Sequence, residues 1–491
     1  MNEFAASWFP GGSGLTASDF AVFGVLLAAM AALGWRAGAG TRTADEYFRG
    51  GRRQPWIAAA LALVAAEVSA LTIVGVPATA FRGDWTFLQF FLGAAAARVL
   101  VAAVFLPAFF RGGGDTVYAY LGERFGPMTR TAAAGSFIAS RLLISGVRLL
   151  AASVAAGTLL GWSPFPTLFL FTFVALIALA RGGAPAAVWT GAFQAAVFLG
   201  VGALSVLYLL HRVDGGLPAA LNVASAASKM SFLRSGPAVF SVALITGFFG
   251  SAAAFGTDQE LAQKLLVVKD AREGRRAMFL SISGSLLVLL VYLLIGTLLF
   301  VFYKQNPGLA LPDRLERIFP YFASTAMPRV LRGLVLSAIV MASIDAPLAS
   351  LSSAYVADLR RPFASGATPE EELAAARRAA VAFALILAGL AALFASSEGA
   401  LSFAFKAGGA TSGPLLGVFA LGLTSKRRGD RTVVSVLGAM VVLNLALLAL
   451  AESGRLPVSW SWLVPLGAVA TYALAWALTR PAPSPEGGRA A

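Results

Sequence analysis

The sequence predicts an all-α, polytopic membrane protein, and three observations support this prediction. Hydrophobic residues make up 58% of the 491 residues, charged residues make up only 13%, and the mean hydropathy is +0.77. Thirteen apolar stretches are each long enough to cross a hydrocarbon core of about 30 Å as a helix. They lack the alternating pattern of a membrane β-barrel. Because soluble globular chains carry about 25% charged residues, this composition argues against a soluble enzyme, a nucleic-acid-binding protein and a disordered protein.

The predicted spans follow one another along the chain, and scattered Gly and Ala residues suit close helix packing in lipid. Two of the connections, 211–236 and 304–329, are long, and we expect short surface helices in both. A further helix start is expected at 369–378, which reads PEEELAAARR. The spans lie at about 18–36, 55–81, 85–110, 131–160, 164–181, 185–210, 237–256, 277–303, 330–357, 379–396, 399–424, 432–452 and 459–479.

The basic residues predict an N-out, C-in orientation in the cell membrane. Residues 1–17 contain no Lys or Arg, whereas Arg36 and Arg42 follow the first span. With the N-terminus outside, 24 of the 38 Lys and Arg residues fall in loops on the inside, as the positive-inside rule requires. Residues 1–17 are therefore expected to be extracytoplasmic, and 480–491 to form a cytoplasmic tail.

The inventory of reactive side chains indicates no enzyme. The chain has no cysteine and a single histidine, His211, which argues against disulfides, thiolate metal sites and histidine-based catalysis. No nucleophile–base pair is visible. We expect a small-molecule solute and the lipid bilayer as partners, with no nucleic acid and no obligate protein partner.

Five motifs occur in a fixed order along the chain. They are DEYFRGGRRQPWIAAALALVAAEVSALTIVGVP at 45–77, DTVYAYLGERFG at 115–126, RGGAPAAVWTGAFQ at 181–194, GTDQELAQKLL at 256–266 and MASIDAPLASLSSAYVADLRR at 341–361. In this order and spacing the chain resembles the sodium/solute symporter family over roughly residues 18–425. The resemblance implies cation-coupled solute uptake by alternating access.

The resemblance also implies a fold: a leading helix at 18–36, inverted five-helix repeats at 55–210 and 237–424, and two additional helices at 432–479. Substrate and ions bind near the midplane of such folds, where helices are broken. Candidate breaks are Gly75 and Pro77 in the second span and Gly247 and Gly250 in the seventh. These spans begin the two repeats. The alternative is that Gly and Pro are simply frequent in membrane helices.

The resemblance implies a sodium site made of backbone carbonyls and hydroxyls. The carbonyl positions fall on Ala65, Val68 and Ile339, and the paired hydroxyl positions fall on Ala342 and Ser343. One of the two hydroxyls is therefore missing. We expect Na⁺ as the coupling ion, with H⁺ as the alternative.

An acidic residue that family members usually carry inside the membrane is missing here, and another acidic residue occurs at a different position. Its usual place after Thr190 is taken by Gly191, while Asp345 stands at a hydroxyl position of the second sodium site that some members have. We hypothesise that Asp345 is a second cation ligand or a proton carrier, because a charge inside a span is costly and usually functional. The alternative is an ion pair with Lys406 or an embedded arginine. Lys406 could also line the inner path or occupy a cation position.

Substrate-site candidates lie on the second, third and fourth spans. Glu67, Ser69 and Thr72 match positions that line the substrate cavity in the family. Glu67 could hold a substrate amine, pair with an embedded arginine or carry a proton. Gln89 is a weaker candidate for hydroxyl or amide recognition.

Arg141 and Arg148 lie two helical turns apart on the fourth span and project from one stripe. Some members that carry acidic substrates use an arginine on this helix for the substrate's carboxylate, so either residue is a candidate. In the alternative, one pairs with Glu67 and the other snorkels or packs against carbonyls. The sequence thus favours a sodium-coupled symporter of a monocarboxylate, amino acid or sugar acid. Proton coupling through Asp345 or Glu67, a neutral-sugar substrate and a membrane solute sensor remain alternatives.

Overall fold

The computed structural model describes residues 16–481 except 161–163, 180, 234–235, 313–314, 343–346, 364–365 and 396–397. Most of the described residues are helical and none of them forms a β-strand, in agreement with the predicted fold class. Two of the predicted cation-site residues, Ser343 and Asp345, lie outside them, as do the predicted extracytoplasmic N-terminus up to residue 15 and the tail from residue 482.

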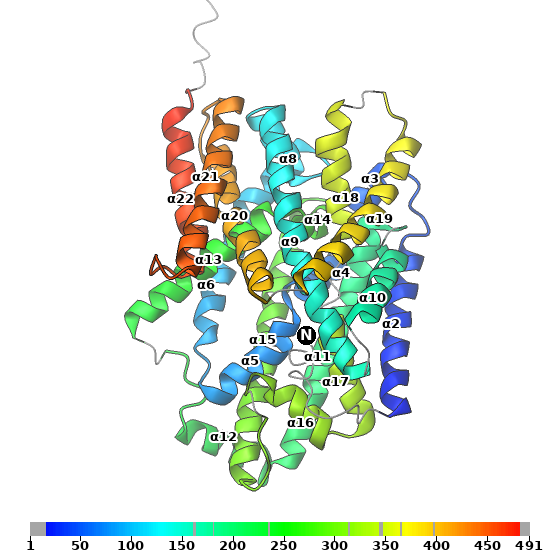
Figure 1. Ribbon diagram of the computed structural model, residues 1–491, viewed down its shortest axis with the longest axis vertical. Helices are drawn as coiled ribbons and strands as arrows, with labels where there is room; N and C mark the ends of the chain where they lie inside the picture. Colours follow the sequence, from blue (N-terminus) through cyan, green and yellow to red (C-terminus); the bar gives the residue numbers. More distant parts are fainter. Residues whose placement is uncertain are drawn as a thin grey trace, which may run out of the picture.

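In chain order the helices are α2 (Ala17–Ala37), α3 (Ala44–Arg49), α4 (Trp56–Glu67), α5 (Ala70–Arg82), α6 (Phe87–Leu100), α7 (Leu106–Gly112), α8 (Val117–Arg124), α9 (Pro127–Leu160), α10 (Pro164–Leu179), α11 (Gly183–Arg212), α12 (Gly216–Ala226), α13 (Pro237–Thr257), α14 (Gln259–Leu266), α15 (Ala271–Gln305), α16 (Ile318–Ala326), α17 (Arg329–Met341), α18 (Leu348–Ala354), α19 (Pro369–Phe394), α20 (Glu398–Thr424), α21 (Asp430–Glu452) and α22 (Leu463–Leu478), with a π-helical turn η2 (Val101–Phe105) between α6 and α7 and another, η4 (Tyr355–Arg360), after α18. Many of the long helices, such as α2, α9, α21 and α22, run roughly along the long axis of the molecule, whereas others, such as α5, are inclined to it (Figure 1).

Within the described residues, each of the thirteen sequence-predicted spans overlaps one helix or two to three consecutive helical segments. Ten helices in the described part of the chain are long and apolar enough to cross a membrane, and the α4–α5 pair, bent by 61°, would make an eleventh. The remaining two spans correspond to α10 and to α17 followed by α18. The number of membrane crossings and the orientation stay predictions.

The expected short helices are present. The connection 211–236 contains α12 and the connection 304–329 contains α16. Figure 1 shows both at one end of the molecule and α8 at the other. Helix α19 begins at Pro369, where the Glu371 amide donates to Oγ1 of Thr368 at 3.2 Å and completes a capping box.

The break predicted in the second span exists, but it lies upstream of the expected glycine and proline. Helix α4 ends at Glu67, and Val68 and Ser69 have extended backbones with φ/ψ of −75°/113° and −112°/171°. Pro77 lies inside α5, in its second turn. A proline is tolerated inside a membrane helix, because neighbouring helices and side chains can bond to the backbone groups that it leaves without a partner. Pro77 therefore need not mark the break.

The break predicted at Gly247 and Gly250 was wrong, because α13 runs unbroken from Pro237 to Thr257. The glycine at 247 instead permits close packing. A Cβ there would lie 2.2 Å from the Phe90 carbonyl oxygen, and a Cβ on Gly93 would lie 2.2 Å from that of Leu244. Helices α6 and α13 therefore approach each other through reciprocal glycines, as small residues allow in membrane proteins.

Two large apolar clusters meet at the break. One cluster gathers side chains from α4, α6, α9, α14 and α19 to α22 and includes Leu63. The other gathers side chains from α2, α5, α11, α15, α16 and α17 and includes Val64 and Ala65. The backbone therefore unwinds where two separately packed parts of the molecule come together.

Candidate functional site

The α4–α5 break frees backbone carbonyls. The amide of Ser69 donates to Oγ1 of Thr72 at 3.3 Å, and the amide of Thr72 donates to the Ser69 carbonyl at 2.8 Å. In a continuous α-helix these two amides would bond to the carbonyls of Ala65 and Val68. Both carbonyls that the family resemblance assigns to sodium are thus released from the helical hydrogen-bond ladder.

A small cavity of about 50 Å³ lies between α4, α11, α14 and the end of α17. Ala65 and Ala342 line it, and so do Gly191, Glu260 and Lys264. Two of the predicted sodium-site positions, one on each helix, therefore share one cavity. Near the end of α17, the Gln194 side-chain amide donates to the Met341 carbonyl at 3.3 Å.

The close approach of α11 to α4 disfavours a carboxylate at Gly191. A Cβ at this position would lie 3.0 Å from both Cα and Cβ of Ala62. Helix α11 approaches α4 so closely here that a side chain would be crowded and Ala62 would have to shift by a few tenths of an ångström. The same cavity does contain a carboxylate, that of Glu260, which pairs with Lys264 at 3.0 Å.

Glu67 forms an ion pair at the break. One of its carboxylate oxygens pairs with the Arg98 guanidinium from α6, and the other accepts a hydrogen bond from the Ser285 hydroxyl on α15. Of the three alternatives for Glu67, the structure contains the pair with an embedded arginine. That arginine is on the third predicted span, not on the fourth.

Arg98 is held in place on several sides. Its Nε lies 3.5 Å from the Ser251 hydroxyl on α13, and its guanidinium carbon lies 4.5 Å from the centre of the Phe255 ring. The side chain is only 3% exposed. A buried guanidinium over an aromatic face gains from cation–π attraction, which is stronger where water is excluded.

The other substrate-site candidates lie elsewhere. Arg141 contacts Asp258 at 3.3 Å and also pairs with Glu260, both at the start of α14. Arg148 lies two turns further along α9, partly buried. The side-chain amide of Gln89 donates to the Phe232 carbonyl at 2.5 Å. The structure thus brings Glu67, Ser69 and Thr72 together at the break and gives Arg141 a different acidic partner from the one considered in the sequence.

Lys406 has a partner that none of the sequence-based alternatives included. Its ammonium lies 2.6 Å from the carboxylate of Glu452, at the end of α21. The expected pairing partner Asp345 is outside the described residues.

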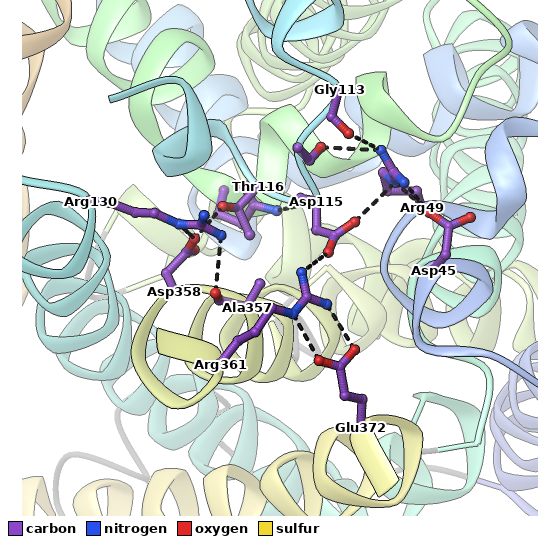
Figure 2. A network of polar contacts seen from close by, with 12 residues as sticks. Asp45, Arg49, Gly113, Asp115, Thr116, Arg130, Ala357, Asp358, Arg361 and Glu372 are labelled. Carbon is purple, nitrogen blue, oxygen red and sulfur yellow. Dashed lines mark hydrogen bonds and ion pairs between the residues drawn. The ribbon is translucent and has the colours of Figure 1, made fainter. Parts of the chain in front are cut away.

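A second set of charges, the inner network, lies near the connections predicted to face the cytoplasm (Figure 2). Asp115 lies 3.3 Å from Arg49 and 2.7 Å from Arg361, and Arg361 also bonds to Glu372 at 2.8 Å. The network ties together the loop before α8 and helices α3, α9 and α19. Its members are Asp45, Arg49, Asp115, Thr116, Arg130, Asp358, Arg361 and Glu372.

Asp358 is the most deeply buried carboxylate of the inner network. Its side chain is fully buried, 2.6 Å from Nε of Arg130 and 2.8 Å from Oγ1 of Thr116. Burial raises the pKa of Asp358 to about 6, although Arg130 and Thr116 act in the opposite direction.

The sequence-based reasoning missed Arg98, Ser251 and Ser285 as neighbours of Glu67. Arg98 carried a usable signal, since it is a charge in the middle of a predicted span. The two serines carried none, because serine is common in membrane helices and only the fold brings α13 and α15 to the break.

The sequence is similar to that of known sodium-coupled transporters. The model of the family described as "Sodium:solute symporter family" matches residues 47–441. The chain is 29% identical over 87% of its length to the sodium/sialic acid symporter SiaT of Proteus mirabilis, covering 89% of that protein. It is 26% identical over 84% of its length to the sodium-coupled monocarboxylate transporter 1 of Xenopus laevis, covering 69% of that protein.

The fold matches a solved structure of a Na⁺-coupled sialic acid symporter, described as substrate-bound and outward-open. The TM-score is 0.86 at 24% identity, over 96% of this chain and 100% of the other. The family match covers most of the chain and includes the broken helix and the cavity beside it. The chain therefore belongs to the sodium:solute symporter family and is a multi-pass membrane transporter, not an enzyme, with sodium as its coupling ion.

Proposed function

We propose that the protein imports a small, carboxylate-bearing organic solute together with Na⁺ by alternating access. The observation that carries the proposal is the α4–α5 break, where the Ala65 and Val68 carbonyls leave the helical ladder beside the cavity lined by Ala342. Unwound carbonyls are suitable ligands for Na⁺ in transporters of this architecture.

The proposed solute binds on the other side of the same break. Glu67, Ser69 and Thr72 supply polar groups, and Arg98 supplies a cation. Because the sodium and solute sites share the residues of one unwound segment, ordering that segment by one ligand favours binding of the other. Such coupling is reciprocal and typically amounts to about 1–3 kcal/mol.

The relatives support a carboxylate-bearing solute. Curated relatives include sodium/sialic acid symporters and sodium-coupled monocarboxylate transporters, and sialic acid is itself a carboxylated sugar. A sodium/iodide cotransporter is also among them, so membership of the family does not by itself determine the solute.

Thermal stabilisation of the purified, detergent-solubilised protein tests the proposal. The panel comprises monocarboxylates, amino acids, sugar acids and neutral sugars, each in Na⁺ and in K⁺ at equal ionic strength. A ligand at 100 times its Kd stabilises by about 2.7 kcal/mol. We expect a carboxylate-bearing solute to stabilise the protein in Na⁺ and much less in K⁺. Stabilisation that is the same in Na⁺ and K⁺ but depends on pH would indicate proton coupling instead.

A further inference from the structure

We infer that the Glu67–Arg98 pair is the recognition element for a zwitterionic solute, one that carries an ammonium and a carboxylate close together, as α-amino acids do. This inference rests on the proposed function and narrows its substrate class. It is drawn from the pair's place at the α4–α5 break, its unequal exposure and an unused donor on the guanidinium.

The first step of the argument is the unused donor. Arg98 presents Nη2 to Glu67 and Nε to Ser251, but its Nη1 is buried and has no hydrogen-bond partner in the described part of the chain. Leaving a buried donor unpaired is destabilising, and more so for a charged group. A guanidinium with an unused N–H group can donate to a second carboxylate without giving up its first partner.

The second step is the accessible carboxylate. The Glu67 side chain is 21% exposed, whereas that of Arg98 is 3% exposed. Glu67 closes the last turn of α4, directly before the extended residues Val68 and Ser69. The Glu67 carboxylate is therefore the more accessible group of the pair, and Ser285 holds it in place.

The third step is the charge of the solute. A plain monocarboxylate that reaches Arg98 brings a second anion next to Glu67, and repulsion between like charges weakens its binding in a poorly hydrated site. A plain amine pairs with Glu67 but leaves Nη1 unused. A zwitterion satisfies both groups, with its ammonium on Glu67 and its carboxylate on Nη1 of Arg98.

The aromatic neighbours support a fixed geometry for this pair. The Arg98 guanidinium lies 4.5 Å from the Phe255 ring centre and 5.6 Å from that of Phe91. Because rings contact it from α6 and α13, the guanidinium has little freedom to turn away from the break. The spacing between the two charged groups is then fixed by the protein, and a solute binds only if its own ammonium and carboxylate match that spacing.

The test measures binding to the full-length protein in detergent with saturating Na⁺, by thermal shift and calorimetry. The probes are the common amino acids and, for each that binds, the acid that lacks the amino group and the amine that lacks the carboxylate (for L-alanine, propionate and ethylamine). We expect at least one amino acid to bind, and both truncated analogues to bind at least tenfold more weakly.

Variants distinguish a solute-binding role of the Glu67–Arg98 pair from a purely structural one, because only the former predicts opposite effects on amino acids and deaminated acids. Glu67→Gln should weaken amino-acid binding at least tenfold while leaving binding of the deaminated acid unchanged or stronger. Glu452→Gln, which alters the carboxylate paired with Lys406 on α21, is the matched control and should change neither. If Glu67→Gln fails to fold, the wild-type comparison of the three analogues still decides.

The outcomes separate this inference from the proposed function. Na⁺-dependent binding of a monocarboxylate, sugar acid or neutral sugar without binding of any amino acid overturns the zwitterion inference but leaves sodium-coupled transport intact. Absence of any Na⁺-dependent binding overturns both.

Discussion

The backbone amide of Ser69 bonds to the side chain of Thr72, at 3.3 Å, rather than to the carbonyl one helical turn before it. This bond is half of a capping box that starts α5, and it also keeps α4 from continuing. The same two residues therefore begin one helix and release the carbonyls at the end of another. The sodium-coupled function proposed for the chain depends on that local exchange of hydrogen bonds.

Replacing Thr72 by valine should weaken Na⁺ binding. The change keeps the side chain's shape but removes the hydroxyl that satisfies the Ser69 amide, and losing a cap costs about 0.5–2 kcal/mol. We expect the apparent Kd for Na⁺, read from a thermal-shift titration, to rise roughly 2- to 30-fold. Thr79→Val is the control, because the Thr79 hydroxyl bonds to the Gly75 carbonyl within α5, away from the break. Equal effects of the two changes would argue against a role for the capping bond.

Restoring the missing hydroxyl should strengthen Na⁺ binding. Ala342 and Ala65 both line the cavity beside the break. Ala342 occupies a position where the family resemblance places a hydroxyl ligand. A hydrogen bond or dipole directed at a charge contributes about 1.5–3 kcal/mol, so Ala342→Ser should lower the Kd for Na⁺ roughly tenfold or more. Ala342→Val fills the cavity without adding an oxygen and should raise it. A serine variant with unchanged affinity would place the sodium site elsewhere.

Alanine at Gly247 should destabilise the protein, whereas alanine at Gly250 should not. The new Cβ at 247 would lie 2.2 Å from the Phe90 carbonyl oxygen, but a Cβ at 250 meets no atom within 4 Å. Overpacking costs typically about 1–3 kcal/mol, while Gly→Ala in a helix can gain up to about 1 kcal/mol. Melting temperatures of the two variants check this directly. Transport lost in Gly250→Ala at unchanged stability would revive the idea of a hinge in α13.

Gly247 also shows which features of the fold could be predicted from the sequence and which could not. The thirteen apolar stretches and the low content of charged residues predicted an all-helical membrane protein, because burial in lipid imposes a simple compositional pattern. Gly247 was ambiguous, since a glycine that breaks a helix and one that lets two helices touch look the same in a sequence. The difference depends on Phe90, 157 positions away, which only the fold brings close.

For the candidate site, the sequence predicted the residues at the break but not their interaction partners. Motif positions identified Glu67, Ser69 and Thr72, which do lie together at the break. The partner of Glu67 was not predictable, because Arg98, Arg141 and Arg148 are equally plausible on charge alone. Packing decides among them: Arg98 lies beside the break, and Arg141 pairs with Asp258 and Glu260.

The pH dependence of stability should contain a contribution from Asp358. Because burial raises its pKa to about 6, above its ordinary value of 3.8, the folded protein favours the protonated carboxyl. That contribution is fully present below about pH 4 and is lost as the pH rises through about 6. The melting temperature of the wild type relative to Asp358→Asn should therefore fall between about pH 4 and pH 6.

The control for this experiment is Asp214→Asn, at an exposed carboxylate in the turn before α12. Its melting temperature should stay parallel to that of the wild type over the same pH range. A wild-type curve that runs parallel to that of Asp358→Asn as well would show that Asp358 is ionised throughout the range and that the Arg130 pair outweighs its burial.

Solute uptake into proteoliposomes under an imposed Na⁺ gradient tests the central claim most directly. The solute is whichever compound of the binding panel stabilises the protein in Na⁺, and the gradients compared are inward Na⁺, inward K⁺ and inward H⁺. We expect accumulation above equilibrium only with inward Na⁺, reduced in Ala342→Val and retained in Thr79→Val. Accumulation driven equally well by inward H⁺ in the absence of Na⁺ would contradict sodium coupling at the α4–α5 break.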